Sequence, residues 1–371
     1  MNNKTIVISA INIRTGGPLT ILRDCLKFLS NSEICKSYRI IALVHNRGLV
    51  EYPNIEYIEF PKSINHWVNR LYYEYFYFKK LSKELNPYLW FSLHDISPNV
   101  SADRQVVYMH NPSIVNKIRF QDIKYDKTYI LFALFYKYLY RINIKRNKYC
   151  IVQQNWFKEE CCKRFSIPKS NVIVASPNIE IGQKYKTSDL KLNKCRNFFF
   201  PSFPRPFKNF ETICEAVKIL YYDGIKDIEV TLTINSDLNS YSSSLVKKYS
   251  SIPSIKFVGL IPHNLMPKYY EDADCLIFPS RLETWGLPIS EFIPFNKPMI
   301  IADLPYAHET SQGANLVTYF NVNAPKELAQ KMKRAYYGDF TDFTSNPLQE
   351  LKHPYAKNYT ELFRILINDD K

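Results

Sequence analysis

The fold is decided by the stretch Cys275-Leu-Ile-Phe-Pro-Ser-Arg-Leu-Glu283-Thr-Trp-Gly286-Leu-Pro288-Ile-Ser-Glu291. Its apolar run at 275–278 predicts a short buried strand that Pro-Ser ends. A loop with Glu283 and Gly286 follows, and Pro288 opens an apolar-periodic run that is typical of a helix start. The pattern predicts a strand, a loop and a helix N-terminus. One carboxylate lies on the loop, and a second, Glu291, lies in the first helical turn.

Such a helix start suits a ligand with two kinds of polar group. A helix N-terminus beside a glycine offers free backbone N–H groups and the positive end of a dipole to a phosphate. Ionised carboxylates only accept hydrogen bonds, so Glu283 and Glu291 suit hydroxyl donors. A sugar nucleotide carries both phosphate and hydroxyl groups, and the stretch predicts a site for one.

The same stretch resembles the signature of the retaining GT-B glycosyltransferases of family 4, P-S-x-x-E-G-F-G-L-P-x-x-E. Here Thr284-Trp285 replaces the family's Gly-Phe, which keeps an aromatic ring but adds bulk near the sugar pocket. The resemblance implies that Glu283 is catalytic and holds hydroxyls of the donor sugar, and that Glu291 binds the ribose. It also implies donor contacts from the backbone of three residues: Gly286, Leu287 and Pro288.

The whole chain has the pattern of an α/β protein. Short β-branched and aromatic runs alternate with amphipathic stretches in both halves, which predicts parallel sheets with crossover helices and two doubly wound Rossmann-like domains. We expect an N-terminal acceptor-side domain at 1–180, a polar linker at 181–196 and a nucleotide-sugar-binding domain at 197–354. The resemblance implies that the domains face each other across a cleft, and that the C-terminal helix at 355–371 packs back on the first domain.

The expected elements follow from these runs. In the first half, strands are predicted at 5–10, 39–44, 55–60, 88–93, 105–109 and 149–153, and helices at 18–29, 67–85, 129–142 and 156–165. In the second half, strands are predicted at 197–201, 229–234, 255–258, 274–278, 298–302 and 315–318, and helices at 210–222, 242–250, 263–270, 288–295, 325–337 and 355–367.

Lys208 lies in the loop after the strand predicted at 197–201, where a cation can meet a diphosphate. Lys208-Asn209 matches the family's Lys-Gly/Asn pair, which implies that Lys208 binds the donor and stabilises charge on the departing diphosphate. The family's Arg, five residues before this Lys, corresponds to Phe203 here. Arg205 is therefore the candidate for a second donor-binding cation, although a solvated loop charge explains it equally well.

Two further features lie after strands of the first half. Gly16-Gly17 follows the first strand and allows close backbone approach. The family's Gly-Gly loop contacts donor and acceptor, which implies donor binding, and a plain tight turn also explains the pair. His110 ends the strand at 105–109 before Asn-Pro, as the family's active-site His does, which implies a catalytic role near the sugar. His94 ends another strand, and both functional and structural roles fit it.

The charge of the chain is concentrated in its first half. Of a net charge of +14, residues 1–180 carry +12, with 26 Lys and Arg against 14 Asp and Glu. The excess peaks between Lys117 and Lys148, where Tyr and Phe are interleaved with the basic residues. Basic residues mixed with aromatic residues suit peripheral contact with an anionic membrane, and a helix with aromatic residues turned inward also fits. A nucleic-acid patch fits less well, so no nucleic acid is expected as a partner.

Bulk properties exclude several classes of protein. No apolar run approaches the ~18 residues of a membrane span, and the apolar stretch at the N-terminus is too short for a signal peptide. None of the eight Cys belongs to a C-x-x-C pair, which favours reduced thiols in the cytoplasm over a zinc site. No G-x-G-x-x-G follows a strand, which argues against a dinucleotide-dependent oxidoreductase.

Together these features predict a glycosyltransferase that needs no metal or cofactor. The resemblance implies retention of the anomeric configuration, and we expect a nucleotide diphosphate sugar as donor and a saccharide acceptor. The basic first half suits an acceptor on a lipid diphosphate at the inner face of the plasma membrane, as in the synthesis of bacterial O-antigen or capsule. Two alternatives remain: a sugar-nucleotide epimerase or hydrolase of the same fold, and a basic nucleic-acid-binding protein, which would give Glu283 and Glu291 no role.

Overall fold

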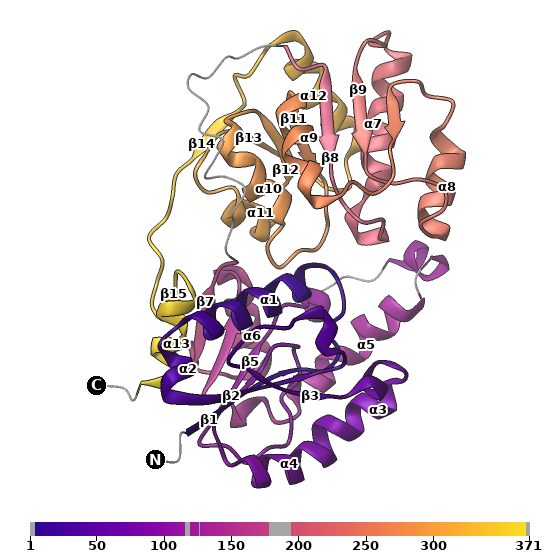
Figure 1. Cartoon of the computed structure of the whole chain (residues 1–371). Coiled ribbons are helices and arrows are strands. Elements are labelled where there is room, and N and C mark those ends of the chain that lie inside the picture. Colours follow the sequence, from indigo (N-terminus) through magenta and orange to yellow (C-terminus); the bar gives the residue numbers. More distant parts are fainter. Residues whose placement is uncertain (1–3, 116–118, 126, 178–193, 369–371) are drawn as a thin grey trace. The chain divides into compact units, whose positions relative to one another are not determined.

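The computed structural model describes residues 4–115, 119–125, 127–177 and 194–368, which form two compact units (Figure 1). The first unit holds the described residues up to 115, those from 133 to 177, and the C-terminal segment from Leu351. The second holds residues 194–350 together with the described residues between 119 and 132. The predicted linker at 181–196 lies, up to residue 193, outside the described residues.

The described part of the first unit is built on a parallel eight-stranded sheet. Its strands are β1 (Lys4–Ala10), β2 (Tyr38–Val44), β3 (Glu56–Glu59), β4 (Pro87–Ser92), β5 (Arg104–Tyr108), β6 (Tyr149–Val152), β7 (Val172–Ala175) and β15 (Tyr355–Ala356), in the order β15-β7-β6-β5-β4-β1-β2-β3. Its helices are α1 (Gly16–Asn31), α2 (Ile34–Ser37), α3 (Trp67–Tyr72), α4 (Phe78–Leu85), the C-terminal part of α5 (Lys127–Arg141), α6 (Asn155–Phe165) and α13 (Tyr359–Ile367).

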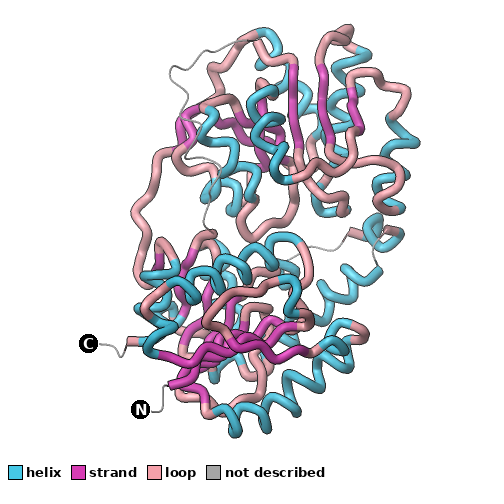
Figure 2. The backbone as a smooth tube through the Cα atoms, viewed as in Figure 1, coloured by secondary structure: helices cyan, strands magenta, loops and turns pink. Residues whose placement is uncertain are grey.

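Both faces of this sheet are buried, which is why its strands are continuously apolar. Ile6 and Ile8 of β1 point to one face and pack with α1 and α13, whereas Val7 points to the other and packs with Phe78 of α4. Successive side chains of a strand alternate between the faces, so one strand supplies two core clusters. Helices accordingly lie on both sides of the strands (Figure 2).

The C-terminal segment is part of the first unit. Tyr355 of β15 is paired in register with Val174 of β7, and the Arg104 guanidinium donates to the carbonyl of Leu366, at 2.8 Å. Figure 1 shows α13, in yellow, among the indigo and magenta elements of this unit. The last helix therefore caps the core that the first half of the chain begins.

The described part of the second unit contains a seven-stranded sheet. Its strands are β8 (Asn197–Phe200), β9 (Glu229–Leu232), β10 (Ile255–Phe257), β11 (Cys275–Phe278), β12 (Met299–Ala302), β13 (Ala314–Phe320) and β14 (Thr344–Asn346), in the order β10-β9-β8-β11-β12-β13-β14. Its helices are α7 (Phe210–Tyr222), α8 (Ser240–Tyr249), α9 (Met266–Asp272), α10 (Leu287–Phe292), α11 (Pro305–Thr310) and α12 (Pro325–Tyr337). The strands are parallel except for β14, which is antiparallel to β13.

Local sequence explains the helices of this unit. In α7 the buried residues Ile213, Val217 and Leu220 recur at helical spacing and face the sheet. In α8 the side chain of Asn239 accepts from the backbone of Ser242, whose hydroxyl accepts from Asn239 in return, and this capping box fixes the helix start.

The predicted α/β class, with two Rossmann-like parallel sheets, is confirmed. Two predicted helices differ from the structure. The helix expected at 67–85 is interrupted by a π-helical segment at Tyr73–Tyr77. The helix expected at 355–367 begins only at Tyr359, because the Asn358 side chain accepts from the backbone of Glu361 and forms the N-cap, while residues 355–356 form β15.

Candidate functional site

The central strands of the second unit carry the predicted donor residues. β8 and β11 are parallel neighbours, with Phe198 paired with Cys275. The loop after β8 carries Lys208 and the loop after β11 carries Glu283, so both side chains start from the carboxyl ends of adjacent strands. This is the edge of an open α/β sheet at which ligands bind.

Lys208 and Glu283 form an ion pair. The Lys208 ammonium donates to Oε1 of Glu283 in a short hydrogen bond, and the two side chains are 19% and 14% exposed. A partly buried cation thus lies directly beside a partly buried carboxylate. The pair presents a charge suited to phosphate oxygens next to acceptors suited to hydroxyl groups.

A buried asparagine holds the loop that carries Lys208. Asn209 adopts a left-handed conformation, with φ 64°, and is fully buried. Its amide donates to the carbonyls of Pro279, at 3.1 Å, and Val322, at 2.9 Å. The backbone N–H of Arg281 donates to the carbonyl of Phe207, at 2.7 Å. These bonds tie the two loops together and fix the relative positions of the ammonium and the carboxylate.

Glu291 lies in α10 and is half-buried. Oε2 of Glu291 accepts from the Tyr270 hydroxyl, at 2.7 Å. Burial raises the pKa of Glu291, while the Tyr270 hydrogen bond and the charge of His263 oppose that rise. The hydrogen bond from Tyr270 therefore favours the ionised form of the Glu291 carboxylate.

The start of α10 requires its glycine. Gly286 has φ 89°, a conformation that other L-residues rarely adopt, and α10 begins directly after it at Leu287-Pro288. The indole N–H of Trp285 donates to the Ser290 hydroxyl, at 3.0 Å, which pins the bulky ring against the helix start. The four predicted donor contacts at 286, 287, 288 and 291 thus follow Glu283 within one turn-and-helix unit.

Arg205 is exposed, and its guanidinium lies over the ring of Phe203, 5.7 Å from the ring centroid. Its backbone carbonyl accepts from the N–H of Lys208, at 2.9 Å, so it shapes the loop through its main chain. The donor role predicted for its side chain stays a prediction.

The remaining predicted residues lie in the first unit. Gly16 has φ 69° and, with Gly17, forms the exposed first turn of α1 rather than the loop before it. His110 follows β5, and its Nε2 lies 3.5 Å from Oδ2 of Asp95. His94 is buried, and burial followed by the charge of Arg70 lowers its pKa well below the usual value, so it stays neutral near pH 7. His94 is thus a buried network residue.

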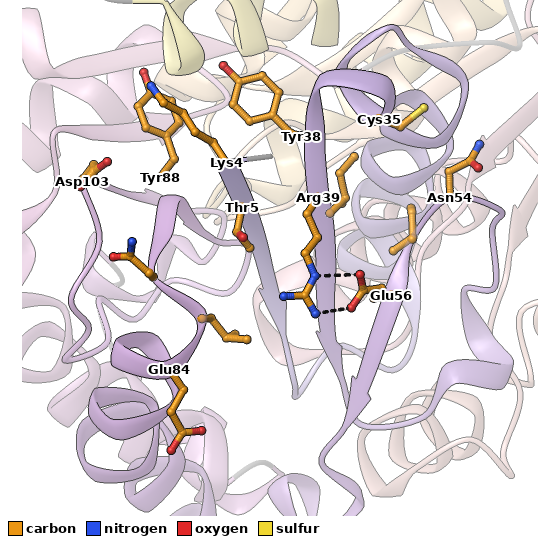
Figure 3. Close-up of a pocket in the computed structure, with 14 residues that line it drawn as sticks. Lys4, Thr5, Cys35, Tyr38, Arg39, Asn54, Glu56, Glu84, Tyr88 and Asp103 are labelled. Atoms are coloured by element: carbon orange, nitrogen blue, oxygen red, sulfur yellow. Dashed lines mark hydrogen bonds and ion pairs between the residues drawn. The ribbon is translucent and has the colours of Figure 1, made fainter. Parts of the chain in front are cut away.

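The first unit also has an open hollow of about 1030 Å³ at the other edge of its sheet (Figure 3). It is lined by the amino ends of strands, including Lys4, Arg39 and Tyr88. Arg39 forms a two-pronged bond with Glu56, and the Lys4 ammonium lies over the Tyr88 ring. Its cations therefore have partners, and none of the predicted site residues lines it.

The described residues contain no group of three or more His, Cys, Asp or Glu side chains placed to bind a metal ion. Within the same residues, the helices are too short or too polar to cross a membrane.

Comparison with known proteins assigns a family to the segment that contains the predicted donor residues. Residues 190–339 match the family model described as glycosyl transferases group 1. This part of the chain belongs to the glycosyl transferases group 1 family. The match contains Lys208 and Glu283, which follow β8 and β11 and form an ion pair, and Glu291 of α10.

Similar proteins agree with the group 1 domain. The chain is 21% identical over 204 residues to the O-antigen chain mannosyltransferase RfbU of Salmonella typhimurium, a match that covers 54% of each protein. The chain thus spans about half the length of this curated relative. The structure of WaaG, a glycosyltransferase involved in lipopolysaccharide biosynthesis, matches with a TM-score of 0.66 and 14% identity over 98% of this chain and all of that one. Anabaena HepE in complex with UDP-glucose matches with a TM-score of 0.60 and 14% identity, over 91% and 93% of the chains. Both solved structures share the fold.

Proposed function

We propose that the chain is a retaining glycosyltransferase that moves a sugar from a nucleotide diphosphate sugar to a saccharide acceptor. The observation that carries the proposal is the ion pair of Lys208 with Glu283, a residue that precedes the turn at Gly286 and the helix α10. The group 1 match and the UDP-glucose bound to HepE support a nucleotide-sugar donor.

The arrangement suits the charges that glycosyl transfer creates. When the bond between the sugar and the phosphate breaks, negative charge builds on the departing diphosphate, and Lys208 would stabilise that charge. Glu283 would accept hydrogen bonds from the sugar hydroxyls, and Glu291 from the ribose. The acceptor oxygen attacks the same face, and its proton passes to the departing phosphate oxygen. We expect this route to need no metal ion.

The first experiment is a thermal-shift screen against UDP, GDP, ADP, CMP, dTDP and their common sugars, with and without magnesium. One nucleotide diphosphate should stabilise the protein independently of the metal, and Glu291→Ala should abolish the shift. Glu271→Ala is the matched control, because Glu271 is exposed in the same unit. A shift that survives in Glu291→Ala would contradict the assignment, and no shift with any nucleotide would contradict the donor class.

We further propose a lipid-linked saccharide acceptor, in the assembly of a bacterial surface polysaccharide such as O-antigen or capsule. The names of RfbU and WaaG connect similar proteins to the O-antigen chain and to lipopolysaccharide. On this proposal the protein works in the cytoplasm, in peripheral contact with the inner face of the plasma membrane. An epimerase or hydrolase of the same fold would consume the donor without any acceptor, so product analysis with and without saccharide separates the two.

Surface features of the first unit support membrane contact. Val68, Tyr72 and Phe76 follow one another at helical spacing and are 74%, 53% and 71% exposed. Lysines at 79, 80 and 83 continue the same helical run and are also exposed. Phe135 and Tyr138 of α5 are exposed as well, and the Trp67 ring contacts the ring of Tyr136 from the same helix. Exposed aromatic side chains flanked by lysines suit an anionic bilayer surface.

A sedimentation assay with vesicles of phosphatidylglycerol and phosphatidylethanolamine tests this contact. The Tyr72→Ser/Phe76→Ser double variant should bind less than the native protein, and binding should fall as salt rises. Tyr222→Ser is the control, because Tyr222 is 75% exposed in the second unit. Equal binding by all three proteins would exclude this surface as the membrane contact.

A further inference from the structure

A hydrogen-bonded cluster lies at the carboxyl ends of β4 and β5, and the proposed reaction gives it no role so far. The two strands are parallel neighbours, so the residues that follow them meet at one edge of the sheet. Asp95 follows β4 and His110 follows β5. Asp95 is buried and has φ 69°, a conformation that aspartate tolerates better than most residues do.

The Asp95 carboxylate collects several donors. Its Oδ1 accepts from the backbone N–H groups of His110, at 2.7 Å, and Asn111, at 3.0 Å, and from the Tyr140 hydroxyl, at 2.7 Å. Its Oδ2 faces the Tyr136 hydroxyl, at 3.4 Å, and Nε2 of His110, at 3.5 Å. One oxygen thus organises the turn that carries His110, and the other faces the imidazole itself.

Buried polar and ionisable side chains contact His94, which follows β4. The Arg70 guanidinium donates to the backbone carbonyl of His94, at 2.8 Å, and lies 3.1 Å from Nδ1 of that ring. Nε2 of His94 lies 3.2 Å from Oε1 of Glu74 and 3.3 Å from Oγ of Ser9. Because Asp95 is the next residue in the chain, these contacts restrict where its carboxylate can lie.

We propose that Asp95 is a positioning residue, which sets the orientation and the tautomer of the His110 imidazole. This inference rests on the proposed function only in giving His110 a part in the reaction. A carboxylate that faces Nε2 favours the tautomer with the proton on that nitrogen, because the ring can then donate to it. The turn alone does not need a charge: a neutral amide oxygen could accept the same backbone N–H groups, whereas burying a carboxylate is costly.

The substitution Asp95→Asn separates the two tasks. An asparagine keeps an oxygen for the N–H groups of His110 and Asn111 and for the Tyr140 hydroxyl. It replaces the oxygen that faces the imidazole with an amide donor, which requires Nε2 of His110 to accept. The neutral ring would then carry its proton on Nδ1, so the variant should switch the tautomer without disturbing the turn.

Nitrogen NMR of the protein labelled with ¹⁵N-histidine measures the tautomer directly. The His110 signals are assigned by their loss in His110→Gln. The native protein should show the Nε2–H tautomer at neutral pH, and Asp95→Asn should show the Nδ1–H tautomer. Asp103→Asn should leave the spectrum unchanged, because Asp103 precedes β5 at the opposite edge of the sheet. An Nδ1–H tautomer in the native protein would overturn the inference, even if Asp95→Asn failed to fold.

Kinetics then show whether the orientation matters for transfer. We expect Asp95→Asn to lower kcat on the order of 10- to 100-fold, the scale found for groups that orient metal-binding histidines, with the donor KM nearly unchanged. In the His110→Gln background the same substitution should cost little more, because its effect passes through the imidazole. Losses that multiply in full would mean that Asp95 acts independently of His110. If the native protein transfers no sugar, the proposed function fails, while the tautomer still decides the role of Asp95.

Discussion

At the scale of single residues, Lys208 and Glu283 set the charge of the proposed donor site. Lys208→Met would leave a diphosphate without its cation, so we expect kcat to fall ~10²- to 10³-fold, the usual effect of removing one donor to developing charge. Glu283→Gln should also lose activity, because its amide replaces an acceptor that sugar hydroxyls need. Steady-state kinetics with the donor found by thermal shift would measure both effects.

Lys226→Met is the matched control for that prediction. Lys226 lies in the same unit but is exposed, with its ammonium over the ring of Tyr221. Its substitution should change kcat much less than Lys208→Met does, and circular dichroism should show all three variants folded. Near-normal turnover in Glu283→Gln would refute the role given to that carboxylate.

The Tyr270 hydroxyl donates to the carboxylate of Glu291, and this gives a pH prediction. Tyr270→Phe removes the hydrogen bond that opposes the rise in the pKa of Glu291, so that pKa should rise further. Ribose hydroxyls need the ionised carboxylate as acceptor. Nucleotide binding should therefore weaken as pH falls, and the weakening should set in at higher pH in Tyr270→Phe than in the native protein.

Calorimetric titration of the nucleotide between pH 5 and pH 8 would measure this difference. Tyr269→Phe is the control, because the Tyr269 ring stacks on Phe199, whereas the hydroxyl of its neighbour Tyr270 donates to Glu291. Identical pH profiles for the native protein and Tyr270→Phe would mean that Glu291 does not have to be ionised for binding.

At the scale of elements, the turn before α10 has a glycine that a side chain would strain. In Gly286→Ala the new Cβ would lie 3.4–3.5 Å from Ile289, Phe278 and Tyr306, which is ordinary contact, so the cost comes from the backbone at φ 89°. We expect a loss of ~1–2 kcal/mol in the free energy of unfolding. Gly17→Ala, where φ is not positive and no atom lies within 4 Å, should be nearly neutral. Urea denaturation compares them, and equal stabilities would argue against the strain.

Sequence alone predicted most elements of both sheets, because strands buried on both faces are continuous apolar runs with clear ends. The predicted helix at 210–222 has the same bounds as α7, since its apolar residues recur at helical spacing. The sequence-based prediction missed the strands β7, β14 and β15, which are short and lie at or near the edges of their sheets. No periodicity signals the π-helical turn at Tyr73–Tyr77, which adds a residue to the turn and shifts the helix face.

The candidate site was predictable only in part, for a related reason. Motif spacing identifies Lys208, Glu283 and Glu291, which lie on loops next to strands. It gives no sign of Asn209 as the buried support of Lys208, of Tyr270 as the partner of Glu291, or of Asp95 as the partner of His110. Those pairings join residues 15 or more positions apart, or depend on a backbone conformation, and only the folded sheet brings them together.

At the scale of the whole molecule, the buried Glu74 couples the stability of the fold to pH. Burial raises the pKa of Glu74 to about 8, against the opposing charge of Arg70. The folded state therefore holds a proton that the unfolded chain releases near its ordinary carboxyl pKa, and stability from this group is lost as pH rises towards 8. His94 works the other way: its lowered pKa makes the fold less stable as pH falls below its ordinary value of 6.5.

The two effects oppose each other below pH 6.5, so the interval from pH 6.5 to 8 separates the effect of Glu74 from that of His94. There the free energy of unfolding of the native protein should fall with pH, with a contribution from Glu74 of at most ~1.4 kcal/mol per pH unit. Glu74→Gln keeps an acceptor for the His94 ring but cannot titrate, so its stability should fall less steeply over this interval. Urea denaturation at fixed pH values, with Glu84→Gln as the control at an exposed site, measures the difference. Parallel slopes for the native protein and Glu74→Gln would mean that Glu74 is already ionised at pH 6.5 and that its pairing through His94 to Arg70 outweighs the cost of burial.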